Sequence, residues 1–151
     1  MKKLIKNYTT EIPVHKTIAE IQRLLGENGA TGVAFDYDGQ GGIKSVYFKI
    51  NFNNRELPFR LPAKEEEVYK TLFADMTGQT NRLVQMRKEK AKMIAWRVCK
   101  LWLEAQLTHV NLGQAKMEEV FLPYLVTGNG KTLYESMIDT NFQLTSGQQH
   151  E

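Results

Sequence analysis

The sequence has little cysteine and no long apolar run. Its one cysteine, Cys99, is typical of a protein from a reducing compartment. No apolar run approaches the ~18 residues that a transmembrane helix needs. The stretch 1–13 carries lysines but lacks the apolar segment and the cleavage site of a signal peptide. We therefore expect a protein of the cytoplasm with no membrane partner.

The chain also lacks the residue clusters that metal binding or nucleophilic catalysis requires. His15, His109 and His150 show no ligand spacing with one another or with Cys99. The cysteine lies beside an apolar helix stripe, where a thiol acts as a small hydrophobic group, and the pattern indicates no base near it. We expect no catalytic residue, no metal site and no cofactor, and we predict that the protein is not an enzyme.

Two short motifs resemble phosphate chemistry but depart from it. The segment 36–39 (DYDG) resembles the first motif of haloacid-dehalogenase-type phosphotransferases, but Gln40 replaces their threonine or valine and no later aspartate pair supplies a magnesium site. The segment 128–132 (GNGKT) resembles the end of a P-loop, but Leu125 stands where the first glycine is needed. Both segments are interpreted as tight turns.

What is present fits one globular domain. With 151 residues, of which 42% are hydrophobic and 25% charged, the chain can bury a core without disulfides or metals. We expect a single α+β domain over residues 1–144 and a disordered polar tail over 145–151. The predicted order is β-α-β-β-β-α-α-α, with an antiparallel sheet of three to four strands. Helices pack mainly on one face of that sheet, and one of them is long and basic.

The N-terminal third predicts a strand, a helix and the start of the sheet. A loosely alternating stretch, 4–12, predicts a short leading strand before Pro13. Thr17 and Glu20 have the spacing of a capping box that opens a helix, which Asn28-Gly29 ends.

The next three runs, 31–37, 43–52 and 56–61, predict an antiparallel meander. In the second run, Val46, Phe48 and Ile50 face the core, so Tyr47 and Lys49 face outward. Arg60 joins this outer face, as does Asp36 or Tyr37 depending on the register. Pro58 cannot donate to a ladder, which predicts an edge strand.

Three helices and one or two last helical turns follow the meander in the prediction. They cover 62–76, 83–110, 114–122 and a short C-terminal segment opened by a second capping box, Thr132 and Glu135. On a helical wheel, one stripe of the long helix is predicted to face the core, and Trp96 lies at the margin of this stripe. The residues of the stripe are Val84, Ala91, Ala95, Val98, Trp102 and Ala105. Its predicted solvent face holds Lys90, Met93, Arg97, Lys100 and Glu104.

Positive charge gathers on this long helix. The span 82–100 contains seven basic residues and one acid, Glu89, in a chain whose net charge is +3. The basic residues are Arg82, Arg87, Lys88, Lys90, Lys92, Arg97 and Lys100. Such a cluster can follow a phosphate backbone, or it can be an ordinary solvated face with helical ion pairs. Both interpretations stay open.

The outer sheet face is the second candidate surface. Tyr37, Tyr47, Lys49 and Arg60 combine aromatic rings with cations, as in open sheets that stack bases and bind phosphates of single strands. A covered face or an oligomer interface fits the same residues. The sequence therefore leaves homo-oligomer formation open.

Two resemblances add context. The order helix, three-stranded meander, helix over 17–76 resembles a double-stranded-RNA-binding domain, and Lys88, Ala91 and Lys92 match that family's K-K-x-A-K helix start, with Glu89 in place of its second lysine. The strings KNYTTEIP, LPFRLPA, AWRVCKLWLEAQL and VFLPYL resemble a family of small uncharacterised proteins of bacteriophages and prophages. The second resemblance implies a virus-encoded protein in a bacterial host cytoplasm, with no activity attached.

The first functional hypothesis is a non-enzymatic, phage-encoded nucleic-acid-binding protein, a DNA replication or recombination accessory. Single strands are slightly favoured over duplex. The alternative is a small protein–protein inhibitor or adaptor that docks its basic helix onto an acidic surface of a host factor. A structural or assembly role in the phage is a third option.

Overall fold

The computed structural model describes residues 3–61 and 63–144. Its elements are α1 (Val14–Glu27), β1 (Ala30–Tyr37), β2 (Ile43–Phe52), β3 (Arg55–Leu61), α2 (Glu65–Phe73), α3 (Asn81–Asn111), α4 (Met117–Val120), the 3-10 turn η1 (Leu122–Tyr124) and α5 (Leu133–Asp139). In this described part, three strands form an antiparallel sheet in the order β1-β2-β3. The predicted α+β fold with a long helix is confirmed, whereas the predicted tail, 145–151, lies outside the described residues.

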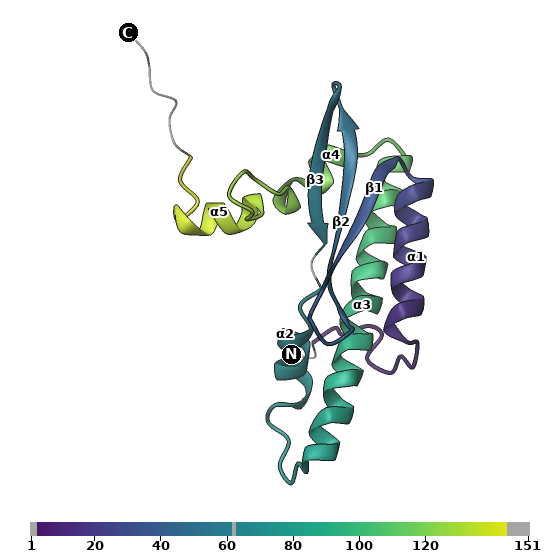
Figure 1. The fold of residues 1–151 in the computed structure, drawn as a ribbon, viewed down its shortest axis with the longest axis vertical. Coiled ribbons are helices and arrows are strands. Elements are labelled where there is room, and N and C mark those ends of the chain that lie inside the picture. Colours follow the sequence, from purple (N-terminus) through teal and green to yellow (C-terminus); the bar gives the residue numbers. More distant parts are fainter. Residues whose placement is uncertain (1–2, 62, 145–151) are drawn as a thin grey trace.

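The helices cover the sheet unequally (Figure 1). α1 and the C-terminal half of α3 lie side by side against one face of the sheet. The N-terminal half of α3 extends beyond the sheet, where α2 packs along it to make a helical hairpin. The C-terminal segment with α5 projects on the other side of β3. The basic start of α3 therefore lies at the free end of the hairpin, away from the sheet.

The core lies between β2, β3 and the two covering helices. Val46, Phe48 and Ile50 are buried, as the alternation of β2 predicted. The Phe48 ring stacks on Phe59 at 5.2 Å between centroids and meets Phe121 edge-on at 5.1 Å. Aromatic pairs stabilise a fold beyond the effect of burying their apolar area. This cluster therefore anchors the C-terminal segment to the sheet.

Both hairpin turns form where the sequence predicts them. The Asp38 carboxylate accepts hydrogen bonds from the backbone N–H groups of Gln40 at 2.7 Å and Gly42 at 3.0 Å. These bonds lower the pKa of Asp38. Asn53 and Asn54 both have positive φ, as a two-residue hairpin turn requires. In the DYDG segment, Asp36 and Tyr37 thus end β1, and Asp38 and Gly39 begin the turn, whose backbone the Asp38 carboxylate stabilises.

The start of α1 differs from the prediction. The helix begins one turn before Thr17, because the carbonyl of Pro13 accepts the N–H groups of Lys16 and Thr17 at 3.1 and 3.3 Å. Thr17 is fully buried inside the helix and caps nothing. Glu20 instead contacts α3. The predicted end at Asn28-Gly29 is confirmed, with Gly29 at a φ of 99°.

The predicted leading strand is wrong. Residues 3–12 form no strand; the chain turns at Asn7, which has a positive φ, and Thr10 N–H donates to its carbonyl. The Lys90 ammonium of α3 binds the Thr10 carbonyl and the Glu11 carboxylate. The loose alternation of apolar residues misled the prediction. The segment is held by side-chain contacts to α3 and not by a strand ladder.

The buried face of α3 is rotated from the predicted stripe. Trp96 is 0% exposed, whereas Val98 and Leu101 are 39% and 40% exposed, and Ala105 is also exposed. The buried residues of α3 are Ala91, Ile94, Ala95, Trp96, Cys99, Leu103 and Leu107. The predicted solvent face is wrong, since α1 packs against the side that carries Arg97 and Lys100.

Candidate nucleic-acid interface

The first part of the candidate interface is the free end of the α2–α3 hairpin, which we call the hairpin tip and define as Arg82, Arg87 and Lys88. The Thr80 hydroxyl caps α3 by accepting the Leu83 N–H at 3.2 Å, so these side chains stand on the first two turns of a capped helix. None of the three forms a salt bridge with another described residue. The tip therefore carries uncompensated positive charge.

Arg87 differs from its two neighbours. Arg82 and Lys88 are exposed, whereas Arg87 is half-buried, and its Nη1 is buried with no hydrogen-bond partner among the described residues. A guanidinium N–H without a partner has lost hydration that no contact replaces. An anion beside Arg87 would supply an acceptor for the other N–H groups and stabilise the charge.

The remaining basic residues of the predicted cluster are neutralised within the chain. Glu20 of α1 lies 2.6 Å from Arg97 and 3.0 Å from Lys100, and Lys100 also contacts Glu104 at 3.0 Å. Each of the two basic side chains is 17% exposed. The hydrogen bond from Lys100, together with Arg97, lowers the pKa of Glu20, and the bond to Glu104 raises the pKa of Lys100.

Lys90 and Lys92 are paired as well. Lys90 lies 2.6 Å from the Glu11 carboxylate in the N-terminal segment, and Lys92 lies 3.4 Å from Glu89 one turn earlier on α3. Both lysines therefore have an acidic partner within the chain. Of the predicted basic set on α3, the hairpin tip holds the residues without a salt bridge among the described residues.

The second part of the candidate interface is the outer sheet face. The register pairs Tyr47 with Ala34 on one side and Arg60 on the other, so Tyr47 and Arg60 lie on this face as predicted. Lys49 also faces outward but lies 3.3 Å from Glu56, and both side chains are about half exposed.

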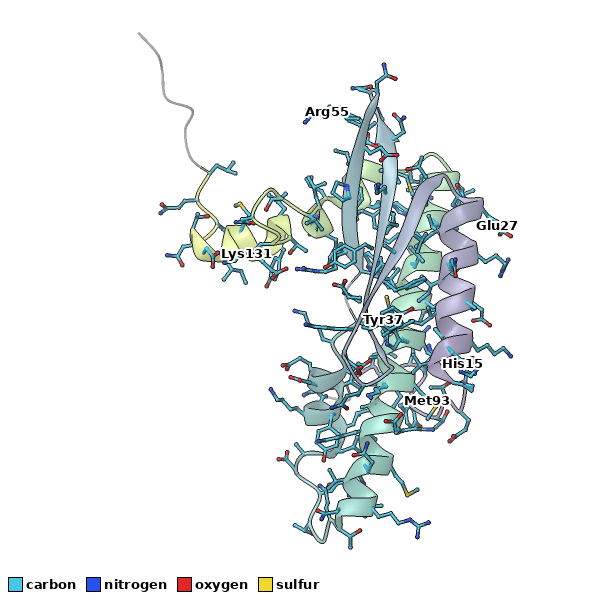
Figure 2. All side chains as sticks on the ribbon, in the orientation of Figure 1. His15, Glu27, Tyr37, Arg55, Met93 and Lys131 are labelled. Carbon is cyan, nitrogen blue, oxygen red and sulfur yellow. The ribbon has the colours of Figure 1, made fainter. Side chains whose placement is uncertain are left out.

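The register also places Asp36. Asp36 pairs with Ser45 and accepts its hydroxyl hydrogen bond at 3.3 Å, so Asp36 lies on the outer face. Tyr37 follows an irregularity in the register and pairs with Ile43. It is 65% exposed at the end of the sheet opposite Arg55 (Figure 2). Asp36 thus belongs to the outer face, whereas the grouping of Tyr37 with Tyr47 stays a prediction.

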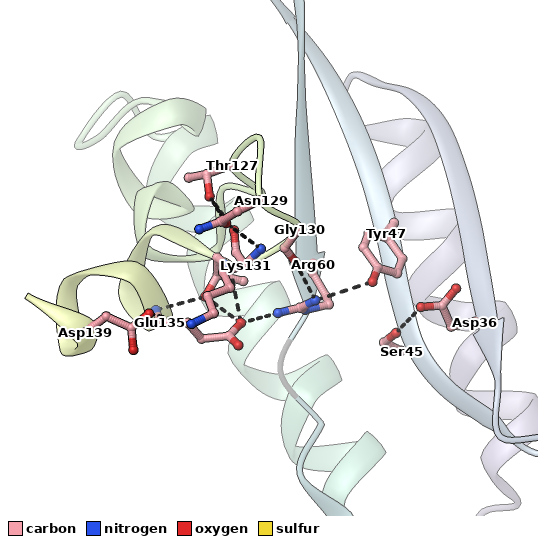
Figure 3. Close-up of polar contacts among 11 residues, drawn as sticks. Asp36, Ser45, Tyr47, Arg60, Thr127, Asn129, Gly130, Lys131, Glu135 and Asp139 are labelled. Carbon is pink, nitrogen blue, oxygen red and sulfur yellow. Dashed lines mark hydrogen bonds and ion pairs between the residues drawn. The ribbon is translucent and has the colours of Figure 1, made fainter.

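Arg60 connects the sheet to α5 (Figure 3). Its guanidinium forms an ion pair with Glu135, donates to the Gly130 carbonyl at 3.3 Å and donates to the Tyr47 hydroxyl at 3.5 Å. The Tyr47 contact and the Glu135 charge raise the pKa of Arg60. Burial acts to raise the pKa of Glu135, but hydrogen bonds from Thr132 and the Arg60 charge lower it overall. Arg60 is thus held rigidly.

A pocket of about 610 Å³ lies where α5 faces the sheet. Tyr47 and Arg60 line it from the sheet, Tyr134 from α5 and Tyr124 from η1. Lys44 and Lys64 line it as well, and both are exposed without a salt-bridge partner in the described part of the chain. Sequence reasoning missed Lys44, Lys64, Tyr124 and Tyr134. The two tyrosines could not be found because only the folded C-terminal segment brings them to the sheet, whereas Lys44 lies on β2 and Lys64 directly before α2.

The C-terminal segment reaches this position through predicted local structure. The turn at 127–131 forms, with Thr127 N–H donating to the Lys131 carbonyl at 2.8 Å, and the capping box of Thr132 and Glu135 opens α5. Val126 N–H donates to the Pro58 carbonyl at 2.8 Å, which covers part of the β3 edge. The sequence indicated the capping role of Glu135 but not its ion pair with Arg60.

No family model matches this chain, and comparison with curated proteins and with solved structures returns no match either. In the described part of the chain, no helix is both long enough and apolar enough to cross a bilayer. No group of three or more His, Cys, Asp or Glu side chains is placed to hold a metal ion among the same residues.

Proposed function

We propose that the protein is a non-enzymatic nucleic-acid-binding protein that contacts phosphates with the hairpin tip. The observation that carries this proposal is the difference between the tip and the rest of α3. Arg82, Arg87 and Lys88 have no salt-bridge partner among the described residues, whereas the basic residues further along the helix are paired with acids. Charge that no acid of the described residues neutralises is available to a polyanion.

The outer sheet face supports the same proposal. The fixed guanidinium of Arg60 lies over one face of the Tyr47 ring, with 5.9 Å between guanidinium carbon and ring centroid, and the two groups together offer a stacking surface. Bases of an unpaired strand stack on such surfaces, whereas the bases of a duplex are already stacked on each other. α5 overhangs part of this face, which leaves room for a strand more readily than for a duplex. Single strands are therefore favoured, and DNA is the expected form.

The resemblance to bacteriophage and prophage proteins supplies the proposed setting. In that setting the protein acts in a bacterial host as an accessory of phage DNA replication or recombination. Such accessories bind strands without sequence readout, which agrees with contacts made by phosphate-binding cations and stacking rings rather than by a base-reading helix.

The test is fluorescence anisotropy of a labelled single-stranded oligonucleotide with wild type and with the triple variant R82A/R87A/K88A. We expect wild type to bind at micromolar protein near about 50 mM salt and the variant to bind at least ~10-fold more weakly. The matched control is K16A/R55A/K116A, which removes the same charge from exposed positions without ion partners in the described part. No binding by wild type under these conditions would exclude the proposal.

One observation favours a protein partner as the second candidate function. Val98 and Leu101 are exposed on α3. Val98 also lines an apolar pocket of about 600 Å³ between α2 and α3, together with Trp102 and Leu72. An exposed apolar strip of this kind is typical of protein-binding surfaces. An inhibitor of a host factor would lose binding in L101E and keep it in R82A/R87A/K88A, whereas a strand-binding protein would show the reverse.

A further inference from the structure

We infer that the pocket between the sheet and α5 binds one nucleotide unit, a flat base together with its phosphate. This inference rests on the proposed function and deepens it, because it assigns the base-binding site. The pocket volume of about 610 Å³ lies within the range of small-molecule sites, about 300–1,000 Å³, and is far too small for a protein element or a duplex.

The walls of the pocket suit a flat aromatic ligand. Tyr47 comes from the sheet and Tyr134 from α5. The Tyr134 ring lies tilted against Phe142 at 6.1 Å between centroids, and Tyr134 stays 45% exposed. Tyr124 lines it too, but its ring packs edge-on against Trp102 at 5.1 Å and so belongs to the framework. Two tyrosines from opposite elements therefore remain to contact a base.

The charges of the pocket suit an anion. Three cations line it, Arg60, Lys44 and Lys64, against the carboxylates of Asp36 and Glu135. Both carboxylates are engaged, Asp36 with Ser45 and Glu135 with Arg60 and Thr132. Three cations against two carboxylates leave the pocket lining with one net positive charge. Neither lysine forms a salt bridge with another described residue, so a phosphate is the group that they would bind.

The pocket is preformed rather than flexible. The Arg60 guanidinium bridges Tyr47, Gly130 and Glu135, so its plane is set before a ligand enters (Figure 3). A flat, fixed guanidinium adds a stacking surface at little cost in conformational entropy. The ligand then needs to order only Tyr134 and the two lysine side chains.

The hairpin tip and the pocket are separate contacts. Glu66 and Glu67 are exposed on the first turn of α2, next to Lys64 in sequence and on the hairpin that ends in the tip. Acidic side chains there disfavour a continuous phosphate track. We therefore expect the pocket to hold one base of a strand, or a free nucleotide, independently of the tip.

The test uses amide chemical shifts of the full chain during titration with a nucleoside monophosphate, followed by oligonucleotide binding. We expect shifts at Tyr47, Arg60 and Tyr134 that Y134A abolishes, and at least ~5-fold weaker oligonucleotide binding by Y134A. K44A/K64A is expected to weaken both ligands, whereas Y8A, which removes another exposed tyrosine, leaves both unchanged.

The outcomes separate the two proposals. If the monophosphate shifts these residues but no oligonucleotide binds, the pocket inference stands and the proposed function fails. If the oligonucleotide binds through the hairpin tip, and Y134A and K44A/K64A both bind it like wild type, the pocket inference is overturned and the proposed function stands. Equal shifts with inorganic phosphate alone would also overturn it, because the base would then contribute nothing.

Discussion

Arg97 of α3 donates a hydrogen bond to Glu20 of α1, with 2.6 Å between Nη1 and Oε2. Lys100 approaches the same carboxylate oxygen at 3.0 Å. One acid of α1 therefore contacts two cations of α3 where the helices pack, and Glu104 of α3 supplies a second negative charge beside Lys100. The basic residues in the middle of α3 are thus paired within the fold, whereas those at its start form no salt bridge with another described residue.

The first prediction concerns the stability of this contact. In E20Q the neutral amide leaves Arg97 and Lys100, which are both mostly buried, without their shared counter-charge. We expect the free energy of unfolding in urea to fall by about 1–3 kcal/mol. The control E27Q breaks the exposed pair with Arg23 and is expected to cost less than about 1 kcal/mol. Equal losses in both variants would contradict the role of Glu20.

The second prediction concerns the pH dependence of that stability. Because the folded-state pKa of Glu20 lies below its ordinary value of 4.5, Glu20 stabilises the fold fully above that value. The contribution disappears as the pH falls through the lowered pKa, when the folded-state carboxylate takes up its proton. Wild type should thus lose more stability than E20Q between about pH 6 and pH 3. Parallel curves in urea titrations would refute this.

The third prediction concerns Glu65, whose pKa shifts the other way. Burial raises the pKa of Glu65, against the opposing effect of a hydrogen bond from the Trp96 indole N–H at 3.0 Å. A raised carboxyl pKa means that the charged form weakens the fold above the folded pKa. E65Q keeps an acceptor oxygen and removes the charge, so we expect unchanged or up to about 1 kcal/mol greater stability at pH 7. A loss larger than that of E66Q would contradict it.

The fourth prediction concerns the docking of α5. E135A removes the ion pair with Arg60 and half of the capping box at Thr132. Because the core cluster of Phe48, Phe59 and Phe121 is untouched, the domain should stay folded while α5 opens locally. Amide hydrogen exchange should accelerate in 133–139 and remain unchanged in β2. Protection equal to wild type in α5 would show that Glu135 does not hold it.

Much of the fold could be predicted because it depends on neighbouring residues. The meander follows from the alternation of β2 and from turn residues such as Asn53 and Asn54, and α3 was predicted to within about two residues at each end. These features need no knowledge of distant parts of the chain.

The faces of α3 and the pocket could not be predicted in the same way. α3 packs on α2 along its first half and on α1 and the sheet along its second, so one wheel cannot describe its burial. The ion pairs that neutralise Lys90 and Arg97 join residues 79 and 77 positions apart. A local charge pattern cannot distinguish such paired cations from the free ones at Arg82 and Lys88.

The most direct measurement of the central claim is the salt dependence of single-strand binding. The logarithm of the association constant should fall linearly with the logarithm of salt concentration, by roughly 0.7 per phosphate contact. If the hairpin tip supplies three contacts, R82A/R87A/K88A should reduce the magnitude of the slope by roughly 2, and K16A/R55A/K116A by much less. Equal slopes for the two triple variants would contradict the assignment of phosphate binding to the hairpin tip.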